Sequence, residues 1–220
     1  MLPPLEILLE DNHVLVVDKP FGMLSQGDLS GDLDALALVK EIIRRRDKKP
    51  GNVFLGLVHR LDRPVGGVMV IAKTSKAAGR LSAQFRERAT RKIYLAVAAG
   101  TPSPEEAVLR HRLAKDRARR ITRVVAEHEP GRDAELAYRL VDARRGRSLV
   151  EVELITGLSH QIRVQLAAIG HPIVGDRKYG SRVAYAPGQV ALFARSLTFR
   201  HPVRKEPVTV TAEPPGDWPF

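Results

Sequence analysis

A chain of 220 residues, 44% hydrophobic and 28% charged, is long enough to bury a core and has an ordinary composition for a globular protein. Lys and Arg outnumber Asp and Glu by 36 to 25, and the net charge of +11 favours a polyanionic partner. No cysteine is present, which excludes disulfides and thiolate sites, and no run approaches the roughly 20 apolar residues that span a bilayer. We therefore expect a cytoplasmic protein that binds nucleic acid rather than membrane.

The first hundred residues predict strands and two helices. Residues 6–19 indicate two short strands about a turn at Asp11-Asn12. Asp32 or Asp34 then caps a helix, because apolar residues recur at helical spacing after it, at Leu36, Val39 and Ile43. The next predicted elements are a buried strand at 67–73, a helix from Thr74 or Ser75 to about Arg88 with Ala78, Leu81 and Phe85 inward, and a strand at 92–99.

The second half is richer in strands. Four strand-like runs lie between residues 107 and 155, and two more follow at 190–199 and 206–213. Between them, residues 159–170 predict a short helix with Ile162, Leu166 and Ile169 inward and Gly170 as its C-terminal stop. No linker is long enough to separate domains, so we expect one α+β domain over residues 1–220. No heptads appear, and we expect a monomer.

Most of the common catalytic motifs are missing. The sequence has no phosphate-binding GxxxxGK[ST] loop, no GxGxxG turn, no HExxH helix and no GxSxG elbow. The seven histidines do not follow a metal-ligand spacing, and a lone one such as His59 or His160 is more often a hydrogen-bonded structural residue. We therefore expect no metal, and no second facing carboxylate can be nominated, so any catalysis must use a single acid.

Asp62 is the acid that stands out, because it lies between Arg60 and Arg63 in "HRLDRPVGG", residues 59–67. The same segment is also typical of a turn, in which an ion-paired Asp caps a loop and the two glycines permit tight backbone geometry. In the catalytic interpretation the glycines let backbone and substrate approach each other. The residues alone leave both interpretations open.

Three segments carry a resemblance to a known family. Residues 59–100, beginning "HRLDRPVGGVMVIAK" and including "KIY", resemble the core of the RluA-like family of RNA pseudouridine synthases. Residues 156–180, "TGLSHQIRVQLAAIGHPIVGDRKYG", resemble its second signature, and "LLEDNHVLVVDKPFGML" resembles its first strands. The resemblance implies the α+β pseudouridine synthase fold, an extended mixed or antiparallel sheet flanked by helices and loops with a central catalytic cleft. It also implies isomerisation of uridine in ribosomal or transfer RNA without cofactor or metal.

The resemblance also implies roles for individual residues. Asp62 matches the family's catalytic aspartate, Tyr94 its active-site tyrosine and Arg163 the basic partner of that aspartate. A cation beside Asp62 favours its charged form, which a nucleophile or base needs. Taken alone, Tyr94 is also typical of strand core and Arg163 of a solvated helix. Arg60 matches an arginine beside the flipped nucleotide, and the substrate-binding positions as a group are His59, Arg60, Arg63, His160 and Gln161.

Several positions depart from the commonest family pattern. Val65 and Gly66 stand where Thr and Ser are frequent, Leu158 replaces an arginine, and Gln165 replaces a histidine. None of these changes removes Asp62. The missing arginine at Leu158 could take away a supporting ion pair or a phosphate contact, which affects the fine geometry of the site.

The segment "RHRLAKDRARRITR", residues 110–123, has seven basic residues against one acid and predicts a hairpin that contacts the RNA backbone. A merely solvated arm is the alternative. The basic residues are Arg110, Arg112, Lys115, Arg117, Arg119, Arg120 and Arg123. Aromatic residues make up only 5% of the chain, so we expect recognition of RNA shape and one extruded base rather than an extended stacking platform.

Three functions are compatible with these features. The first is an RNA pseudouridine synthase with Asp62 as its catalytic carboxylate. The second is a non-catalytic RNA-binding or assembly protein with the same fold, which would bind RNA equally well without Asp62. The third is a hydrolase of another ribosyl compound, which would release free base. Retention of Asp62, Tyr94 and Arg163 favours the first.

Overall fold

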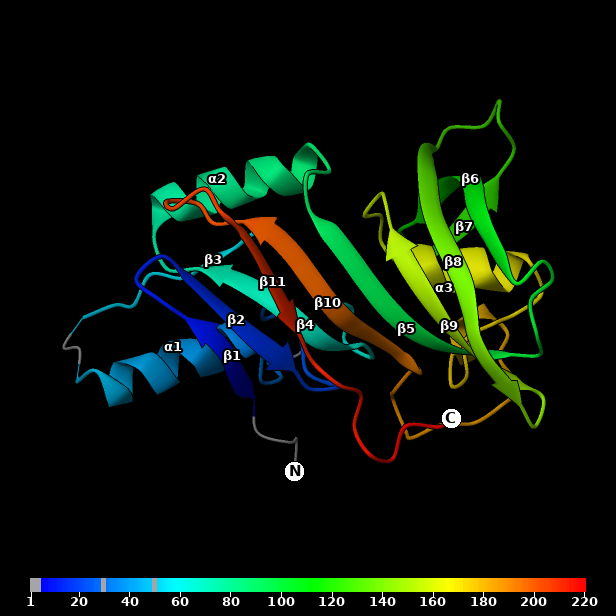
Figure 1. Ribbon diagram of the computed structural model, residues 1–220, viewed down its shortest axis with the longest axis horizontal. Coiled ribbons are helices and arrows are strands. Elements are labelled where there is room, and N and C mark those ends of the chain that lie inside the picture. The colour runs from blue at the N-terminus through cyan, green and yellow to red at the C-terminus, as the bar shows by residue number, and fades with distance from the viewer. Residues whose placement is uncertain (1–4, 29–30, 49–50) are drawn as a thin grey trace. The chain divides into compact units, whose positions relative to one another are not determined.

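The computed structural model describes residues 5–28, 31–48 and 51–220, and its contacts divide the chain into two compact units. The first unit contains residues 1–91 and 194–213, and the second contains residues 92–193 and 214–220 (Figure 1). The chain therefore passes between the units at residues 91–92, 193–194 and 213–214. One catalytic domain over residues 1–220 stays a prediction.

The first unit is built on antiparallel strands. Its strands are β1 (Glu6–Glu10), β2 (Val14–Lys19), β3 (Gly56–Leu57), β4 (Gly66–Ala72), β10 (Leu192–Arg200, of which Ala194 onward belongs here) and β11 (Pro207–Thr211). Their order is β1-β2-β4-β10, with β3 paired to β4 and β11 to β10. The predicted turn at Asp11 is confirmed: its carboxylate accepts hydrogen bonds from the N–H groups of His13 (2.7 Å) and Val14 (2.8 Å), which fixes the β1–β2 hairpin.

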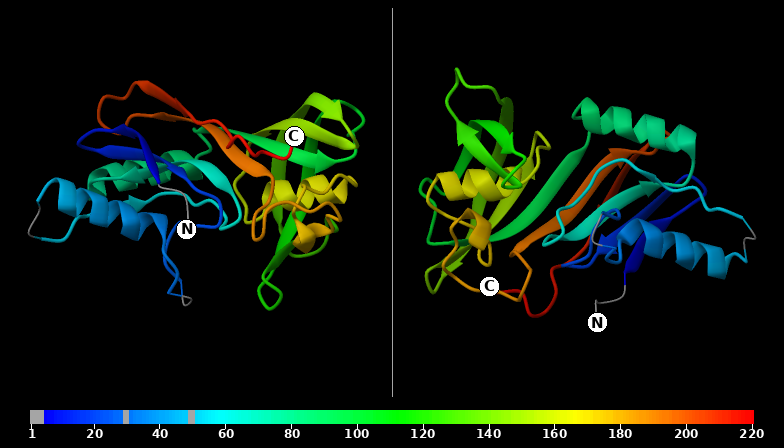
Figure 2. Two further views of the ribbon diagram at one scale, coloured as in Figure 1. Left: turned by 90° about the horizontal axis from the view of Figure 1, so that it is seen from below. Right: turned by 180° about the vertical axis from the view of Figure 1, so that it is seen from behind.

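Two helices cover one side of these strands (Figure 2). They are α1 (Ala35–Arg46) and α2 (Ser75–Arg86). Each begins at the side-chain cap that the sequence predicts, because Asp34 accepts from the N–H of Ala37 at 2.9 Å and Thr74 accepts from that of Ala77 at 3.2 Å. Their apolar faces bury Val39, Ile43 and Leu81 as predicted. Ala77, rather than the predicted Ala78, is the buried alanine of α2.

The second unit contains the four strands predicted between residues 107 and 155. They are β6 (Glu106–Asp116), β7 (Ile121–Val125), β8 (Arg132–Arg144) and β9 (Arg147–Leu154), and the order including β5 (Arg91–Ala99) is β5-β9-β8-β6-β7. Neighbours along this order pair antiparallel. The basic segment forms the predicted hairpin, with Asp116 opposite Ile121 where β6 turns into β7.

One helix and a 3₁₀ turn pack beside these strands. They are α3 (Gln161–Ala168), which contacts β6 and β7, and η1 (Arg177–Tyr179). Gly170 follows α3 at φ 88°, so it is the predicted C-terminal stop. Val164 of α3 packs on Leu113 of β6 and Ala134 of β8 in a small apolar cluster. No helix in the described part of the chain is long and apolar enough to cross a membrane.

Candidate active site

Asp62 belongs to the first unit and lies in a turn between β3 and β4. Its backbone carbonyl accepts a hydrogen bond from the N–H of Val65 at 3.0 Å. The preceding residue, Leu61, is held by Ser25, whose hydroxyl donates to the Leu61 carbonyl at 2.7 Å and accepts from its N–H at 3.1 Å. Leu61 and Val65 are buried and Asp62 is half-buried. Buried neighbours on both sides therefore fix the backbone of Asp62, while Asp62 itself stays partly exposed.

Lys19 is a fully buried lysine at the end of β2, close enough to Asp62 for their charges to interact. Its ammonium donates to the carbonyls of Pro20 (3.0 Å) and Met23 (2.8 Å) and so ties down the loop after β2. Burial lowers the pKa of Lys19 from 10.5 to about 7, and the charges of Asp62 and Asp18 act in the opposite direction. A titratable cation therefore accompanies the candidate catalytic acid.

The two arginines beside Asp62 differ in their surroundings. Arg63 donates to the Gly22 carbonyl at 3.0 Å and to the Asp32 carboxylate at 2.7 Å, and its own carbonyl accepts from the Gly22 N–H at 2.9 Å. It therefore clamps the loop after β2. Arg60 is exposed and forms no ion pair with a carboxylate in the described part of the chain, so its guanidinium is available to a phosphate or a nucleotide.

His59 has structural contacts in the first unit. Its Nε2 accepts a hydrogen bond from the N–H of Val70 at 3.0 Å, so the ring nitrogen facing β4 carries no proton. The ring stacks on Phe85 of α2, with centroids 4.5 Å apart and planes 16° apart. His59 joins its loop to β4 and α2, and its predicted contact with substrate stays a prediction.

Gly66 and Gly67 are required by contacts within the chain. A Cβ at Gly66 would lie 2.8 Å from the Phe21 ring, and one at Gly67, where φ is 115°, would lie 2.6 Å from the backbone nitrogen of Ala194. The two glycines therefore allow the Phe21 ring and strand β10 to lie close to the backbone at residues 66 and 67. Gly66 departs from the family pattern at a position where a larger residue would displace an aromatic ring.

Arg163 lies on α3 in the second unit, in a buried ion pair with Asp176. Its Nε donates to Asp176 Oδ2 at 2.6 Å and its Nη2 donates to Oδ1 at 2.8 Å, a two-point contact that fixes the plane of the guanidinium. The residues are 4% and 1% exposed. This contact holds the Arg163 guanidinium in one orientation.

Tyr179 connects Arg163, α3 and the basic hairpin within the second unit. Its ring centroid lies 5.1 Å from the Arg163 guanidinium carbon. Its hydroxyl is 2.6 Å from His160 Nδ1 and accepts from the N–H of Thr122 in β7 at 2.9 Å. Burial raises the pKa of Tyr179 above its usual value of 10.0, so the phenol stays protonated at neutral pH.

The amide of Gln161 makes internal hydrogen bonds. Its oxygen accepts from the Thr156 hydroxyl (2.8 Å) and the Leu158 N–H (3.0 Å), and its nitrogen donates to the Glu135 carbonyl at 3.1 Å. Gln161 is 2% exposed and fixes the loop that leads into α3. Its predicted role in substrate binding is untested.

Tyr94 is placed by β5, where it is opposite Val152 of β9 and 9% exposed. The structure thus groups His59, Arg60, Asp62 and Arg63 with Lys19 in one unit, and Tyr94, His160, Gln161 and Arg163 with Asp176 in the other. The predicted pairing of Asp62 with Arg163 and Tyr94 joins residues of both units and stays a prediction.

Comparison with known proteins identifies the family. The model of the RNA pseudouridylate synthase family matches residues 13–168, most of the chain. The chain belongs to this family. The synthase is 39% identical over 219 residues to the dual-specificity RNA pseudouridine synthase RluA of Escherichia coli (strain K12), a match that covers 98% of this chain and 95% of that protein. It is also 36% identical to the ribosomal large subunit pseudouridine synthase D of Xanthomonas campestris pv. campestris, over 97% of this chain and 67% of that one.

Solved structures confirm the fold predicted for the synthase. Human RNA Pseudouridylate Synthase Domain Containing 4 superposes with a TM-score of 0.79 at 24% identity, over 96% of this chain and 89% of that one. The expected α+β pseudouridine synthase fold is therefore confirmed. The family match and the two relatives show that the chain is an RNA pseudouridine synthase, an isomerase. In the described part of the chain, no group of three or more His, Asp or Glu side chains is placed to hold a metal ion.

The structure accounts for two further departures from the family pattern. Leu158 packs against the apolar cluster around Val164, where an aliphatic side chain fits better than the arginine of the family pattern. Gln165 is fully buried, donates to the Leu109 carbonyl at 3.1 Å and lies 3.0 Å from His111 Nδ1, so it joins α3 to β6. Both residues have packing roles in the synthase.

The basic hairpin of β6 and β7 is partly neutralised. Arg110 pairs with Glu135 at 3.0 Å, Arg112 with Asp133 at 2.9 Å and Arg123 with Glu129 at 3.6 Å, and Arg119 reaches Asp116 at 4.0 Å. Three of the predicted cations are exposed and make no ion pair with a described carboxylate: Lys115, Arg117 and Arg120. These three cluster at the turn of the hairpin.

Sequence reasoning did not nominate Lys19 or Asp176. Lys19 reads as an ordinary charged residue before Pro20, although it stands in a segment that resembles the family's first strands. Asp176 lies within the quoted second signature, in "GDRKYG". Asp176 is the one acid among the 25 residues of that signature, and this was the available signal that Arg163 has a local partner.

Proposed function

We propose that this synthase isomerises specific uridines in ribosomal or transfer RNA to pseudouridine, with Asp62 as the catalytic carboxylate. The names of two relatives support the substrate class, since one is a ribosomal large subunit synthase and the other a dual-specificity RNA synthase. Because those RNAs are modified where they are made, we also propose a cytoplasmic location, and a monomer as the acting form.

The reaction rearranges bonds without adding or removing atoms overall. The bond between N1 and C1′ breaks and C5 bonds to C1′, while the proton on C5 leaves to solvent and N1 gains one. Asp62 would act on the uridine as nucleophile or base, through attack at C1′, addition at C6 or proton abstraction from the sugar. Each of these routes needs an ionised carboxylate.

The other predicted residues take supporting roles in this proposal. The uracil must leave the base stack to be turned over, at a cost of a few kcal/mol. The exposed Arg60 guanidinium would occupy the space left by the flipped nucleotide. Tyr94 would stack on the uracil, and Arg163, held by Asp176, would present its charge to Asp62.

The turn of the basic hairpin would bind the RNA backbone. Lys115, Arg117 and Arg120 are exposed and make no ion pair with a described carboxylate, so phosphates can neutralise them without breaking internal contacts. The affinity for RNA should then fall steeply as salt is raised.

The observation that carries the proposal is that Asp62 is partly exposed while its buried neighbours fix its backbone. Replacing Asp62 with the isosteric asparagine tests the proposal. Tritium release from RNA labelled at uridine C5 is measured for wild type, Asp62→Asn and the control Asp47→Asn, which changes a surface acid at the end of α1. RNA from cells lacking the gene keeps the target sites unmodified. We expect Asp62→Asn to lose about a thousandfold or more in rate, to bind RNA as wild type does, and Asp47→Asn to stay active.

Two results would count against this assignment. Tritium release by Asp62→Asn at the wild-type rate would exclude Asp62 as the catalytic acid. Release of free uracil would indicate a hydrolase instead of an isomerase.

A further inference from the structure

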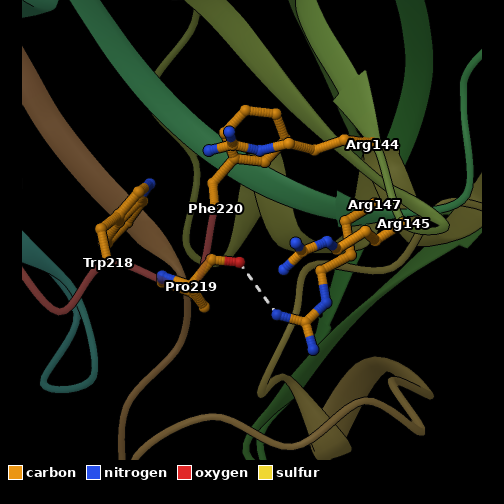
Figure 3. Close-up of a pocket in the computed structure, with 6 residues that line it drawn as sticks. All are labelled: Arg144, Arg145, Arg147, Trp218, Pro219 and Phe220. Carbon is orange, nitrogen blue, oxygen red and sulfur yellow. Dashed lines mark hydrogen bonds between the residues drawn. The ribbon is translucent and has the colours of Figure 1, made fainter.

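A hollow of about 460 Å³ lies in the second unit beside the turn between β8 and β9, and none of the predicted site residues lines it. Figure 3 shows the two segments that line it: three arginines of the hairpin face a short segment that carries two aromatic rings. The lining residues are Arg144, Arg145, Arg147, Trp218, Pro219 and Phe220. A volume of this size lies in the usual range for small-ligand sites, roughly 300–1,000 Å³.

The turn between β8 and β9 carries three arginines. Two of them face each other with like charges, and the third has a backbone conformation that arginine seldom adopts. Arg144 and Arg147 are direct partners across the antiparallel pair, where like charges destabilise. Between them Arg145 and Gly146 have φ of 52° and 72°, a pair of positive values that favours Asn-Gly over Arg-Gly. The facing pair of Arg144 and Arg147 therefore adds a charge repulsion that the fold of the turn does not require.

None of the three arginines forms an ion pair with a carboxylate of residues 5–28, 31–48 or 51–220. By contrast, Arg139 on the same strand pair is neutralised by Glu151 at 3.1 Å. Each guanidinium has five N–H donors in a planar fork that matches phosphate. Arg147 donates one of them to the Pro219 carbonyl at 2.9 Å, which leaves its remaining donors for a ligand.

Aromatic contacts fix the opposite wall. The Arg144 guanidinium lies 4.3 Å from the centroid of the Phe220 ring, and Trp218 packs edge-on against Phe193 and Tyr185 with centroid distances of 6.2 Å. The indole is therefore held in place where it lines the hollow. An ordered aromatic ring beside guanidinium groups is the combination that binds a base and its phosphate together.

We propose that this hollow binds one nucleotide of an RNA strand, its phosphate on the guanidinium groups of Arg144, Arg145 and Arg147 and its base against the Trp218 indole. The proposal rests on RNA being the substrate of the synthase. It adds a contact on the β8–β9 turn for a part of the RNA other than the isomerised uridine.

The test uses Trp218 as its reporter, because it is the one tryptophan of the chain. Full-length protein is titrated with an oligouridylate of about five nucleotides and, separately, with inorganic phosphate, and Trp218 fluorescence is followed. We compare wild type with the double variant Arg144→Gln/Arg145→Asn. Asn suits the positive φ at residue 145, so the turn should keep its fold. The control is Arg88→Asn, an exposed arginine at φ 59° that undergoes the same change.

We expect saturable fluorescence change with the oligouridylate, a Kd raised about tenfold in the double variant, and a Kd within about twofold of wild type in Arg88→Asn. Three results would overturn the proposal. The first is unchanged Trp218 fluorescence when fluorescence anisotropy shows that a labelled oligouridylate binds. The second is a wild-type Kd in the double variant, and the third is inorganic phosphate that binds as tightly as the oligouridylate. Tritium release by wild type separates this proposal from the proposed function. Absence of release counts against the isomerase activity. Whether the hollow binds a nucleotide is decided by the fluorescence result alone.

Discussion

Removing the negative charge from Asp176 should be among the most damaging single-atom changes in the second unit. Asp176→Asn keeps the size and shape of the side chain. It replaces one acceptor oxygen with an NH₂ group that faces a guanidinium N–H of Arg163, and it removes a charge that lies 2.6 Å from Arg163 Nε. Nothing else in the structure needs to move, so the effect measures the cost of removing one charged partner from the buried pair.

The size of the effect follows from burial. The Arg163 and Asp176 side chains are 5% and 1% exposed, so water cannot replace the lost contact. Breaking a buried pair by removing one partner costs about 3–5 kcal/mol, a large share of a total stability of about 5–15 kcal/mol. The matched change Asp133→Asn also breaks an Arg–Asp pair, at 2.9 Å to Arg112, but Asp133 is 88% exposed. That change should cost less than about 1 kcal/mol.

Urea unfolding followed by circular dichroism gives the free energy of unfolding of both variants. We expect Asp176→Asn to unfold at a much lower urea concentration than Asp133→Asn. Losses of equal size, or a loss below about 1 kcal/mol for Asp176→Asn, would refute the reasoning from burial. In that case Arg163 would be positioned by groups other than Asp176.

Two further predictions concern the first unit. Lys19 releases its proton near pH 7 when folded and near 10.5 when unfolded, so the unfolding free energy should rise with pH between these values, by up to about 1.4 kcal/mol per unit. Lys19→Met should flatten that rise in urea unfolding at about pH 7, 8 and 9, and identical slopes would exclude the buried ammonium as its origin. Gly67→Ala should cost about 2–5 kcal/mol, because its Cβ meets the Ala194 backbone at a positive φ. Gly188→Ala, at φ 72° with open space around it, should cost about 1–2 kcal/mol, and equal losses in thermal unfolding would argue against the Ala194 contact.

The elements of the fold were predictable because their signals are local. Asp34 and Thr74 cap helices with side chains that reach three residues along the chain. The burial of Val39 and Ile43 follows from helical spacing. The Asp11 turn and the β6–β7 hairpin likewise depend on neighbouring residues.

Contacts over long sequence separations were not predictable. The Phe21 ring that excludes a side chain at Gly66 is brought there by the loop after β2, and nothing in "GGVMVIA" indicates it. Lys19 reads as a surface cation, and only the folded loop supplies the carbonyls of Pro20 and Met23 that allow its burial. The division into two units has no compositional mark, since its boundaries fall at the start of β5, inside β10 and shortly after β11.

For the candidate site, the motifs predicted which residues matter and left out how they are held. Asp62 and Arg163 were nominated from their signatures. Their supports are Ser25 and Leu61 for one, and Asp176 for the other. Such supports depend on packing geometry that a motif does not encode.

The split of the first unit between residues 1–91 and 194–213 has a consequence during synthesis on the ribosome. β4 is buried along its whole length in the finished protein, and β10, its neighbour, is translated more than a hundred residues later. At 5–20 residues per second, roughly ten seconds pass in which that apolar edge has no β10 to cover it. Meanwhile β6, β7, β8 and β9 emerge and can pair with one another. Much of the second unit can therefore form before the last strands of the unit that carries Asp62 have been synthesised. During this interval the apolar edge of β4 is open to chaperones that bind exposed apolar strands.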